Sequence, residues 1–354
     1  MEELPQPKPA YILKRGAYDA PGEQVSAETP KVLPPLPAGA PRNRLGLAQW
    51  LASAENPLMS RVTVNRAWQI MFGRGIVETS DNFGAQGSVP SHPELLDWLA
   101  RNFRTSGWNY KALLKKIAMS AAYRQSSKAS PAVLARDPDN KLLARGPARR
   151  LTAEMLRDQA LALSGLLADK IGGPSVKPYQ PPGLWEIAMG NPKYEQGRGD
   201  DLHRRSLYTF WKRTVPPPAM LAFDAPERNV CLVRRQSTST PLQALTLLND
   251  TQIVEAARFV SERMLKEGGA APDDQIAWAF RLITSRRPSP KELTILRQLF
   301  REQRDLFAAD QQAAAKLLAV GETPNDPALS PVDLAAGTVL AEALFNHDEA
   351  VMRR

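Results

Sequence analysis

The chain has 354 residues, of which 43% are hydrophobic, so it can bury a large core, and its length favours about two domains. Its 46 Lys and Arg residues outnumber its 37 Asp and Glu residues, and the formal net charge of +9 favours anionic partners such as nucleic acid or acidic glycans. The basic residues form no long run, which argues against nucleic-acid binding, and no stretch of the sequence has the composition of a signal peptide or a transmembrane helix.

Residues 1–42 are predicted to form an extended, proline-rich arm. Nine of the 31 prolines lie here, and proline lacks the backbone donor that a helix requires. Tyr11 to Lys14 could form a short strand, after which Gly16 and the Pro21-Gly22 pair would turn the chain. We favour a strap lying across the body of the protein over this strand.

Residues 43–171 are predicted to form a helical subdomain. Apolar residues recur at helical spacing from Arg44 onward, from Leu58 to Phe72, from Tyr110 to Ala122 and from Thr152 to Leu167. The helix from Leu58 to Phe72 is apolar on more than one face, so we expect it to be central and Trp68 to be buried. Asn65 lies on its apolar stripe, and we expect Asn65 and Arg66 to hold neighbouring loops.

Helix starts are predicted at four capping-box patterns, in which a Ser or Thr is followed three residues later by an acidic residue or Gln. These are Ser91 to Glu94, Thr240 to Gln243, Ser289 to Glu292 and, in a weaker form, Ser330 to Asp333. Further helices are expected at Thr251 to Lys266 and Asp274 to Ser285, each with an apolar stripe and a polar far face. The predicted fold is therefore mainly α, a multi-helix orthogonal bundle in which a second helical subdomain, 241–354, packs on the first.

Residues 172–240 are predicted to form one long irregular loop region with short strands, one of them at Leu207 to Trp211. Loops of this length in a folded body are functional or disordered, and the aromatic content of this one argues against disorder. Its rings and charges make it the candidate ligand-binding surface, with these residues: Tyr179, Trp185, Arg205, Tyr208, Trp211, Lys212, Arg213, Asp224, Arg234 and Arg235. The same rings could instead dock the loop onto the helices.

The charges of this loop allow two further interpretations. The Arg204-Arg205, Lys212-Arg213 and Arg234-Arg235 pairs could form ion pairs with nearby carboxylates, or could cradle an anion. The carboxylates themselves could act as acid and base in a glycan hydrolase, and they are Asp200, Asp201, Asp224 and Glu227. The common hydrolase and nucleotide-binding motifs are absent from the sequence. The residues thus leave open whether the chain is an enzyme.

Cysteine and histidine are too few for most cofactor sites. Cys231 is the only cysteine, so neither an internal disulfide nor a covalent haem attachment can form, and the three histidines are far apart in the sequence. We therefore predict no metal and no cofactor in this chain.

Several separated strings resemble a planctomycete surface-domain family of unknown function, which forms the C-terminal region of planctomycete cytochrome-c domain proteins. The matching strings are Leu4 to Gly22, Asn65 to Gly75, Asp81 to Gly87, His92 to Trp98, Tyr123 to Ser126, Gly172 to Trp185 and Arg205 to Asp250. The resemblance implies a periplasmic or cell-surface location and a longer parent protein, with a haem-binding cytochrome-like domain and an uncharacterised domain before this region.

The favoured hypothesis is therefore an extracytoplasmic binding or docking module, with the N-terminal domains of the parent chain, or an acidic or sulfated glycan, as its partner. Haem is expected only in the cytochrome-like domain of the parent. A hydrolase that uses the carboxylates of residues 200–227 is the first alternative, and nucleic-acid binding through the basic surface is the second.

Overall fold

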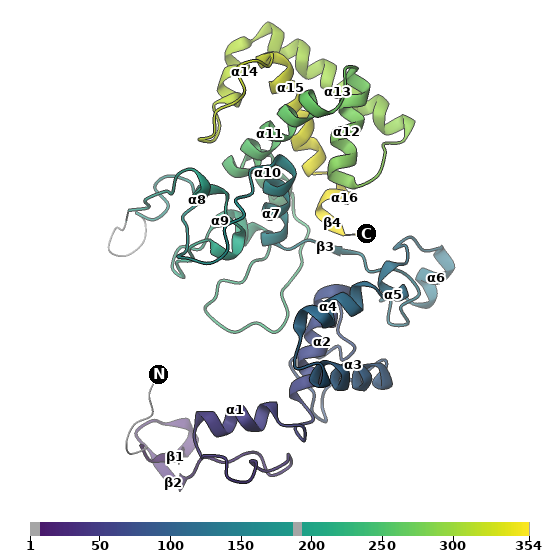
Figure 1. Ribbon diagram of the computed structural model, residues 1–354. Coiled ribbons are helices and arrows are strands. Elements are labelled where there is room, and N and C mark those ends of the chain that lie inside the picture. The colour runs from purple at the N-terminus through teal and green to yellow at the C-terminus, as the bar shows by residue number, and fades with distance from the viewer. Residues whose placement is uncertain (1–7, 187–192, 354) are drawn as a thin grey trace. The chain divides into compact units, whose positions relative to one another are not determined.

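The chain divides into two structural units (Figure 1). The computed structural model describes residues 8–186 and 193–353, so residues 1–7 of the predicted arm and 187–192 of the predicted loop lie outside the described residues. Unit 1 comprises Met1–Gln125 and Ala129–Gly146, and unit 2 comprises Ser126–Lys128 and Pro147–Arg354. Helices dominate the described residues, which confirms the mainly α prediction and is compatible with helical bundles. The predicted segment boundaries at 42, 171 and 240 stay a prediction.

Unit 1 begins with a β-hairpin. Strand β1 (Ala10–Leu13) pairs antiparallel with β2 (Pro21–Val25), and a 3-10 turn, η1 (Lys14–Gly16), lies between them. The strand considered near Tyr11 therefore exists and pairs within the arm itself. The expectation that Pro21 and Gly22 form a turn was wrong, because the chain has already reversed by Ala20, whose carbonyl accepts from the Lys14 amide at 2.9 Å.

In unit 1, α3 and α4 pack on the second helix, α2. Val64, Ala67 and Trp68 of α2 are buried in one core with residues of α3 and α4, which confirms the central placement of α2. One side of this helix stays open, since Ile70 is 49% exposed. The helices of this unit are α1 (Arg44–Ala52), α2 (Met59–Phe72), α3 (Pro93–Thr105), α4 (Tyr110–Ala118), α5 (Ala121–Arg124) and α6 (Pro131–Arg136).

Asn65 holds the segment that follows α2, as predicted. Its side chain is fully buried, its Nδ2 donates to the carbonyl of Val77 at 2.9 Å, and its Oδ1 accepts from the Val77 amide at 2.8 Å. Its Nδ2 also donates to the Ser80 hydroxyl at 3.2 Å. Arg66, to which the same role was assigned, is exposed.

Three of the four predicted helix caps are present. Thr240 and Ser289 form reciprocal capping boxes, and Ser330 caps its helix by accepting from the Asp333 amide. The box predicted at Ser91 was wrong. His92 is the N-cap residue of α3, because the Ser91 hydroxyl contacts the Ile76 carbonyl and the His92 ring instead.

Unit 2 is built around two long buried helices, α11 and α15. α15 is apolar on all sides and buried along most of its length, as is typical of a core helix. The two helices approach closely at Gly337, where an added Cβ would lie 2.1 Å from the Ser261 hydroxyl oxygen. That hydroxyl donates to the Leu334 carbonyl at 2.9 Å, which links α11 to α15.

The other elements of unit 2 cover these two helices. The four longest are α11 (Thr251–Glu267), α12 (Pro272–Thr284), α13 (Pro290–Ala309) and α15 (Pro331–Phe345). The shorter helices are α7 (Ala153–Ser164), α8 (Asp200–His203), α9 (Pro218–Ala222), α10 (Pro241–Asn249), α14 (Gln311–Leu318) and α16 (Asp348–Val351). A two-stranded sheet joins β3 (Arg149–Arg150) to β4 (Met352–Arg353).

The strand predicted at Leu207 to Trp211 was wrong. A 3-10 turn, η2 (Ser206–Tyr208), occupies its first half, and only an isolated bridge joins Thr209 to Val176. The turn forms because the Asp158 carboxylate accepts from the Ser206 amide at 2.7 Å and holds the chain in a tight bend. Leu207 is exposed while Thr209 is buried, although a strand would place both side chains on one face.

Candidate functional site

The long loop between α7 and α10 is fastened to unit 2 by buried arginines. Arg157 of α7 is 9% exposed, and its guanidinium donates to the carbonyls of Leu202 and Arg204 at 2.7 Å and to the Gln252 side chain at 2.9 Å. Burial lowers the pKa of Arg157 to about 10. This side chain therefore holds the loop segment around residues 202–204 against α11.

Arg204 fastens the part of the loop that begins just after α7. It is 1% exposed, and its guanidinium donates to the carbonyls of Lys170, Gly172 and Pro174. The same group lies 3.8 Å from the centre of the Tyr208 ring, a cation–π contact. The Tyr208 hydroxyl in turn accepts from the Gly172 amide at 2.8 Å. Arg204 and Tyr208 thus stabilise the loop itself.

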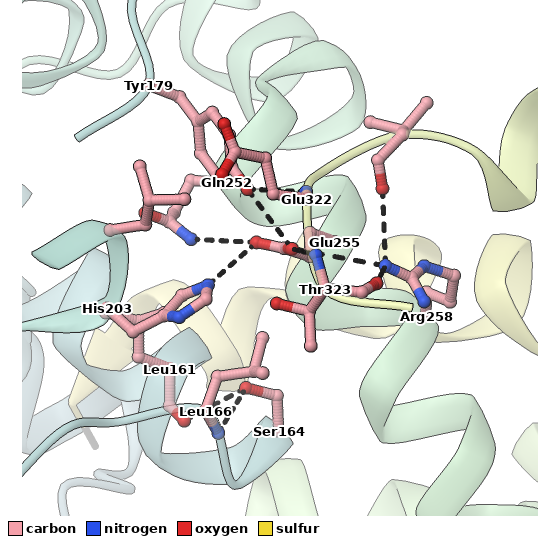
Figure 2. Close-up of polar contacts among 12 residues, drawn as sticks. Leu161, Ser164, Leu166, Tyr179, His203, Gln252, Glu255, Arg258, Glu322 and Thr323 are labelled. Atoms are coloured by element: carbon pink, nitrogen blue, oxygen red, sulfur yellow. Dashed lines mark hydrogen bonds and ion pairs between the residues drawn. The ribbon is translucent and has the colours of Figure 1, made fainter. Parts of the chain in front are cut away.

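A buried carboxylate, Glu255 of α11, lies at the centre of a polar cluster (Figure 2). Its Oε2 lies 2.9 Å from the His203 Nε2 at the end of α8. Its Oε1 accepts from the Thr323 amide at 2.9 Å and from the Tyr179 hydroxyl at 3.2 Å. The Tyr179 hydroxyl also accepts from the Glu322 amide at 2.7 Å. One carboxylate therefore joins α11, the long loop and the loop before α15.

The electrostatics of this cluster keep Glu255 ionised. Burial raises its pKa, but the hydrogen bonds from His203 and from the Thr323 amide lower the pKa by more, so it ends below its ordinary value. Because the carboxylate can only accept, the His203 Nε2 must carry a hydrogen. Arg258 lies 4.0 Å from the Glu255 carboxylate and donates to the carbonyl of Thr323 at 2.6 Å. With its acceptor sites taken, Glu255 acts as a structural clamp.

The polar face predicted to be the far side of the α11 helix is therefore buried. Glu255, Arg258 and Glu262 are all less than a tenth exposed, and loop backbone covers them. None of these three residues was predicted as functional. Their spacing of three and four residues is the same as that of a solvated helix face, so the sequence pattern did not distinguish the two.

Trp185 lies in an aromatic cluster. It is 6% exposed, its indole nitrogen donates to the Gln180 side chain at 2.9 Å, and its ring is near those of Tyr194 and Phe210, with centroid separations of 4.9 and 5.8 Å. The Lys212 ammonium lies 4.7 Å from the centre of the Trp185 ring. Trp185 and Lys212, both candidate ligand-binding residues, contact each other.

The remaining candidate residues divide into two groups. Asp224 and Arg235 are engaged within the protein, since Asp224 accepts from the Thr238 amide at 2.7 Å and Arg235 forms a two-pronged ion pair with Glu154 at 2.7 and 3.0 Å. The Trp211 indole donates to the Glu227 carbonyl at 3.1 Å. The exposed group comprises Arg205, Arg213 and Arg234. A ligand-binding role for all ten candidate residues stays a prediction.

The carboxylates considered for hydrolysis do not share a described pocket. Asp200 and Asp201 are exposed in the first turn of α8, and Glu227 is exposed beside Asn229. Neither of the two pockets described below is lined by these residues or by Asp224. The described residues contain no cluster of three or more His, Cys, Asp and Glu side chains that could hold a metal ion.

An apolar and basic stretch, residues 226–248, lies largely exposed on unit 2. Val230 is 71% exposed, Leu232 is 54% exposed, and Leu242 and Leu245 of α10 are 61% and 55% exposed. α10 buries Gln243 and Leu247 and so turns these two leucines outward. We call residues 226–248 the exposed segment.

The exposed segment also forms a pocket of about 380 Å³. Its lining combines apolar side chains, two arginines and the single cysteine, namely Pro226, Arg228, Asn229, Val230, Cys231, Leu232 and Arg235. The Asp224–Thr238 and Glu154–Arg235 contacts fix the start and the end of this loop. Residues 227–237, between these contacts, are exposed.

No helix in the described part of the chain is long and apolar enough to span a membrane. No curated protein and no solved structure matches the sequence. Residues 43–300, which are well over half of the 354, match the family described as PSD1, protein of unknown function (DUF1553). This match includes α1 to α12, both pockets and the exposed segment. The chain therefore belongs to this family.

Proposed function

We propose that this chain is a docking module that binds a partner domain through the exposed segment. The observation that carries the proposal is the exposure of Val230, Leu232, Leu242 and Leu245 within one short stretch of chain. Folded monomers rarely leave large apolar patches uncovered, and those that remain mark interaction sites. Burial of one Leu or Val side chain contributes about 1.5–3 kcal/mol, so a few of them suffice for a specific contact.

The charge of the exposed segment indicates the chemistry of the partner. Arg228 and Arg234 are exposed, and the whole chain carries a net charge of +9. A surface that exposes apolar and basic side chains is complementary to one that exposes apolar and acidic side chains, and such complementarity increases the rate of association. We therefore propose a partner domain that presents acidic residues around an apolar centre.

The resemblance to cytochrome-linked proteins supports a more specific partner. We propose that the chain lies outside the cytoplasm, at the cell envelope, and docks the cytochrome-like domain of its parent protein. In this arrangement the haem belongs to the partner, and the present chain contributes the contact surface. The Asp224–Thr238 and Glu154–Arg235 contacts support this role, since a loop that is held near both ends loses less entropy on binding than a free one.

Cys231 provides a direct test, because it is the only cysteine and its side chain is exposed. The rate at which a maleimide labels Cys231 would be measured with increasing amounts of the purified cytochrome-like domain. We expect labelling to slow in proportion to the fraction bound. An unchanged rate, with no complex in analytical ultracentrifugation, would rule out this docking.

Matched variants make the test specific. Leu232→Asp and Leu242→Asp place a charge at an apolar contact and should weaken binding by about tenfold or more. Ile295→Asp is the control, since Ile295 is 57% exposed on α13 and lies outside the exposed segment. Equal losses in all three variants would contradict the assigned surface.

The exposed arginines favour a second candidate partner, an acidic or sulfated glycan. Arg205, Arg213 and Arg234 are exposed, and none of them forms an ion pair within the described part of the chain. Heparin, used as a sulfated probe in the labelling assay, distinguishes the two partners. Protection of Cys231 by heparin that disappears in high salt, without protection by the cytochrome-like domain, would favour the glycan.

A further inference from the structure

Unit 1 contains a pocket of about 280 Å³ that none of the predicted site residues lines. It is formed by the end of α2, the segment that follows it, the residues before α3 and the loop after α6. Trp68 and Phe72 provide the aromatic wall, while Arg74, Glu78, Asp139 and Lys141 provide the charged groups.

Trp68 brings a hydrogen-bond donor, its indole N–H, to the lining of this pocket. Trp68 is 6% exposed, and its ring stacks on that of Phe72 with a centroid separation of 4.1 Å and an interplanar angle of 11°. Among the described residues, no hydrogen bond engages its indole nitrogen. The indole nitrogen is not among the buried side-chain atoms that lack a partner, so solvent reaches it. A ligand in the pocket that this side chain lines would accept from the indole N–H in place of water.

The charges around the pocket cancel. Arg74 forms ion pairs with Glu78 and, at 3.2 Å, with Asp139, and Lys141 adds a second positive charge. Two cations and two carboxylates leave no net charge when His92 is neutral. A lining of this kind offers hydrogen-bond donors and acceptors together but does not favour a strongly charged ligand.

We infer that this pocket binds a neutral, hydroxyl-rich ring, such as one unit of a sugar. Each sugar hydroxyl can both donate and accept, which fits the mixed lining, and the C–H face of the ring fits an aromatic wall. At about 30 Å³ for each water, the pocket has room for roughly nine waters. That is space for a small ring. An inorganic anion would instead require a net positive lining.

Several polar groups of the pocket lining would form hydrogen bonds with the sugar. Sugar oxygens would accept hydrogen bonds from the Trp68 N–H and the Lys141 ammonium. The Nε2 of His92 is free to bind a sugar hydroxyl, because the other ring nitrogen, Nδ1, already lies 3.0 Å from the Ser91 hydroxyl. Glu78 and Asp139 would accept from sugar hydroxyls with the lone pairs that Arg74 leaves free. These groups come from three separate segments of unit 1, so only the folded unit assembles them.

Isothermal titration calorimetry of the full chain tests the inference. The probes are glucose, galactose, mannose, xylose and N-acetylglucosamine, with sodium sulfate and adenosine as a charged and an aromatic comparison. We expect at least one sugar to bind and both comparison compounds to fail. Binding of sulfate or adenosine instead, or of no sugar in the panel, would overturn the inference.

Two variants place the binding in this pocket. Trp68→Phe removes the N–H while retaining an aromatic ring, and we expect it to weaken sugar binding by about twofold to tenfold, as for one lost hydrogen bond. Asp139→Asn, at a more exposed position, should also weaken sugar binding. This second variant tests the pocket even if Trp68→Phe disturbs folding. Trp98→Phe is the control, since Trp98 is 54% exposed on α3 and does not line the pocket. Equal affinities for wild type and both pocket variants would contradict the assignment.

Discussion

Gly321 lies directly against the carboxyl group of Glu255. A Cβ added at Gly321 would be 2.6 Å from the Glu255 Oε1, and the φ angle of Gly321 is +91°. Two independent constraints therefore require glycine here: a backbone conformation that other residues rarely adopt, and the absence of space for a side chain. The position closes the loop before α15 over the buried carboxylate.

Gly321→Ala should lower the free energy of unfolding by about 2–4 kcal/mol, because backbone strain adds to the displacement of a buried charged group. Gly172→Ala is a matched control in the same unit, since Gly172 has a φ of +81° and nothing within 4 Å of its added Cβ. The control should lose only the strain component, about 1–2 kcal/mol. Urea unfolding measures both, and equal losses would show that the Glu255 contact contributes nothing.

The stability of unit 2 should depend on pH through Glu255. Its pKa is lowered in the folded chain, so the ionised carboxylate stabilises the fold above the unfolded pKa, and this stability is lost as pH falls through the folded pKa. Glu255→Gln should cost about 1–3 kcal/mol at neutral pH and should flatten the acid side of the stability curve. A variant with the same acid dependence as wild type would contradict the role of this group.

Glu342 of α15 should have the opposite effect on the pH dependence of stability. The residue is 7% exposed, its carboxyl has no hydrogen-bond partner among the described residues, and burial raises the pKa of this carboxyl to about 7. The unfolded chain releases this proton first, so stability falls as pH rises from 4.5, the ordinary pKa of a glutamate, to about 7 and stays lower above that.

Glu342→Gln should therefore stabilise the protein by about 2–3 kcal/mol above the folded pKa and have no effect in acid. Glu302→Gln is the control, because Glu302 is an exposed carboxylate on α13 of the same unit. Thermal unfolding across this pH range gives the answer. A gain that does not vary with pH would indicate a packing effect in place of a titrating carboxyl.

Asn65→Ala should destabilise unit 1 by about 2–4 kcal/mol, because it leaves the buried Val77 amide without a partner and the Val77 carbonyl with only the Ser80 hydroxyl at 3.5 Å. Arg66→Ala, one residue away and exposed, should change stability by no more than about 0.5 kcal/mol. Circular dichroism with urea unfolding compares the two. Similar losses would mean that the buried amide is not what holds this segment.

The helices of this fold were predictable because their signals are local. Apolar spacing and caps such as Thr240 and Ser289 act within one helix, and the structure has helices at these places. The engagement of the candidate site residues was not predictable in the same way. Arg235 meets Glu154 and Tyr179 meets Glu255, and these partners lie 81 and 76 residues away in the chain. No local pattern indicates a contact of that kind.

The burial of the charged residues of α11 was also not predictable from the sequence. Glu255, Arg258 and Glu262 have the spacing of a solvated stripe, and only the loops that cover α11 make them interior. Asn65 was recognised because apolar neighbours surround it on its own helix. A polar residue within an apolar stripe can thus be identified from sequence, whereas a polar stripe under a loop cannot.

The pairing of β3 with β4 places Arg149 beside Arg353 and Arg150 beside Met352. The entry and exit points of the larger helical body are therefore adjacent in space, although some two hundred positions separate them in the chain. A short peptide could join them covalently, and new ends could be opened in an exposed turn elsewhere. This body is thus a suitable scaffold for circular permutation.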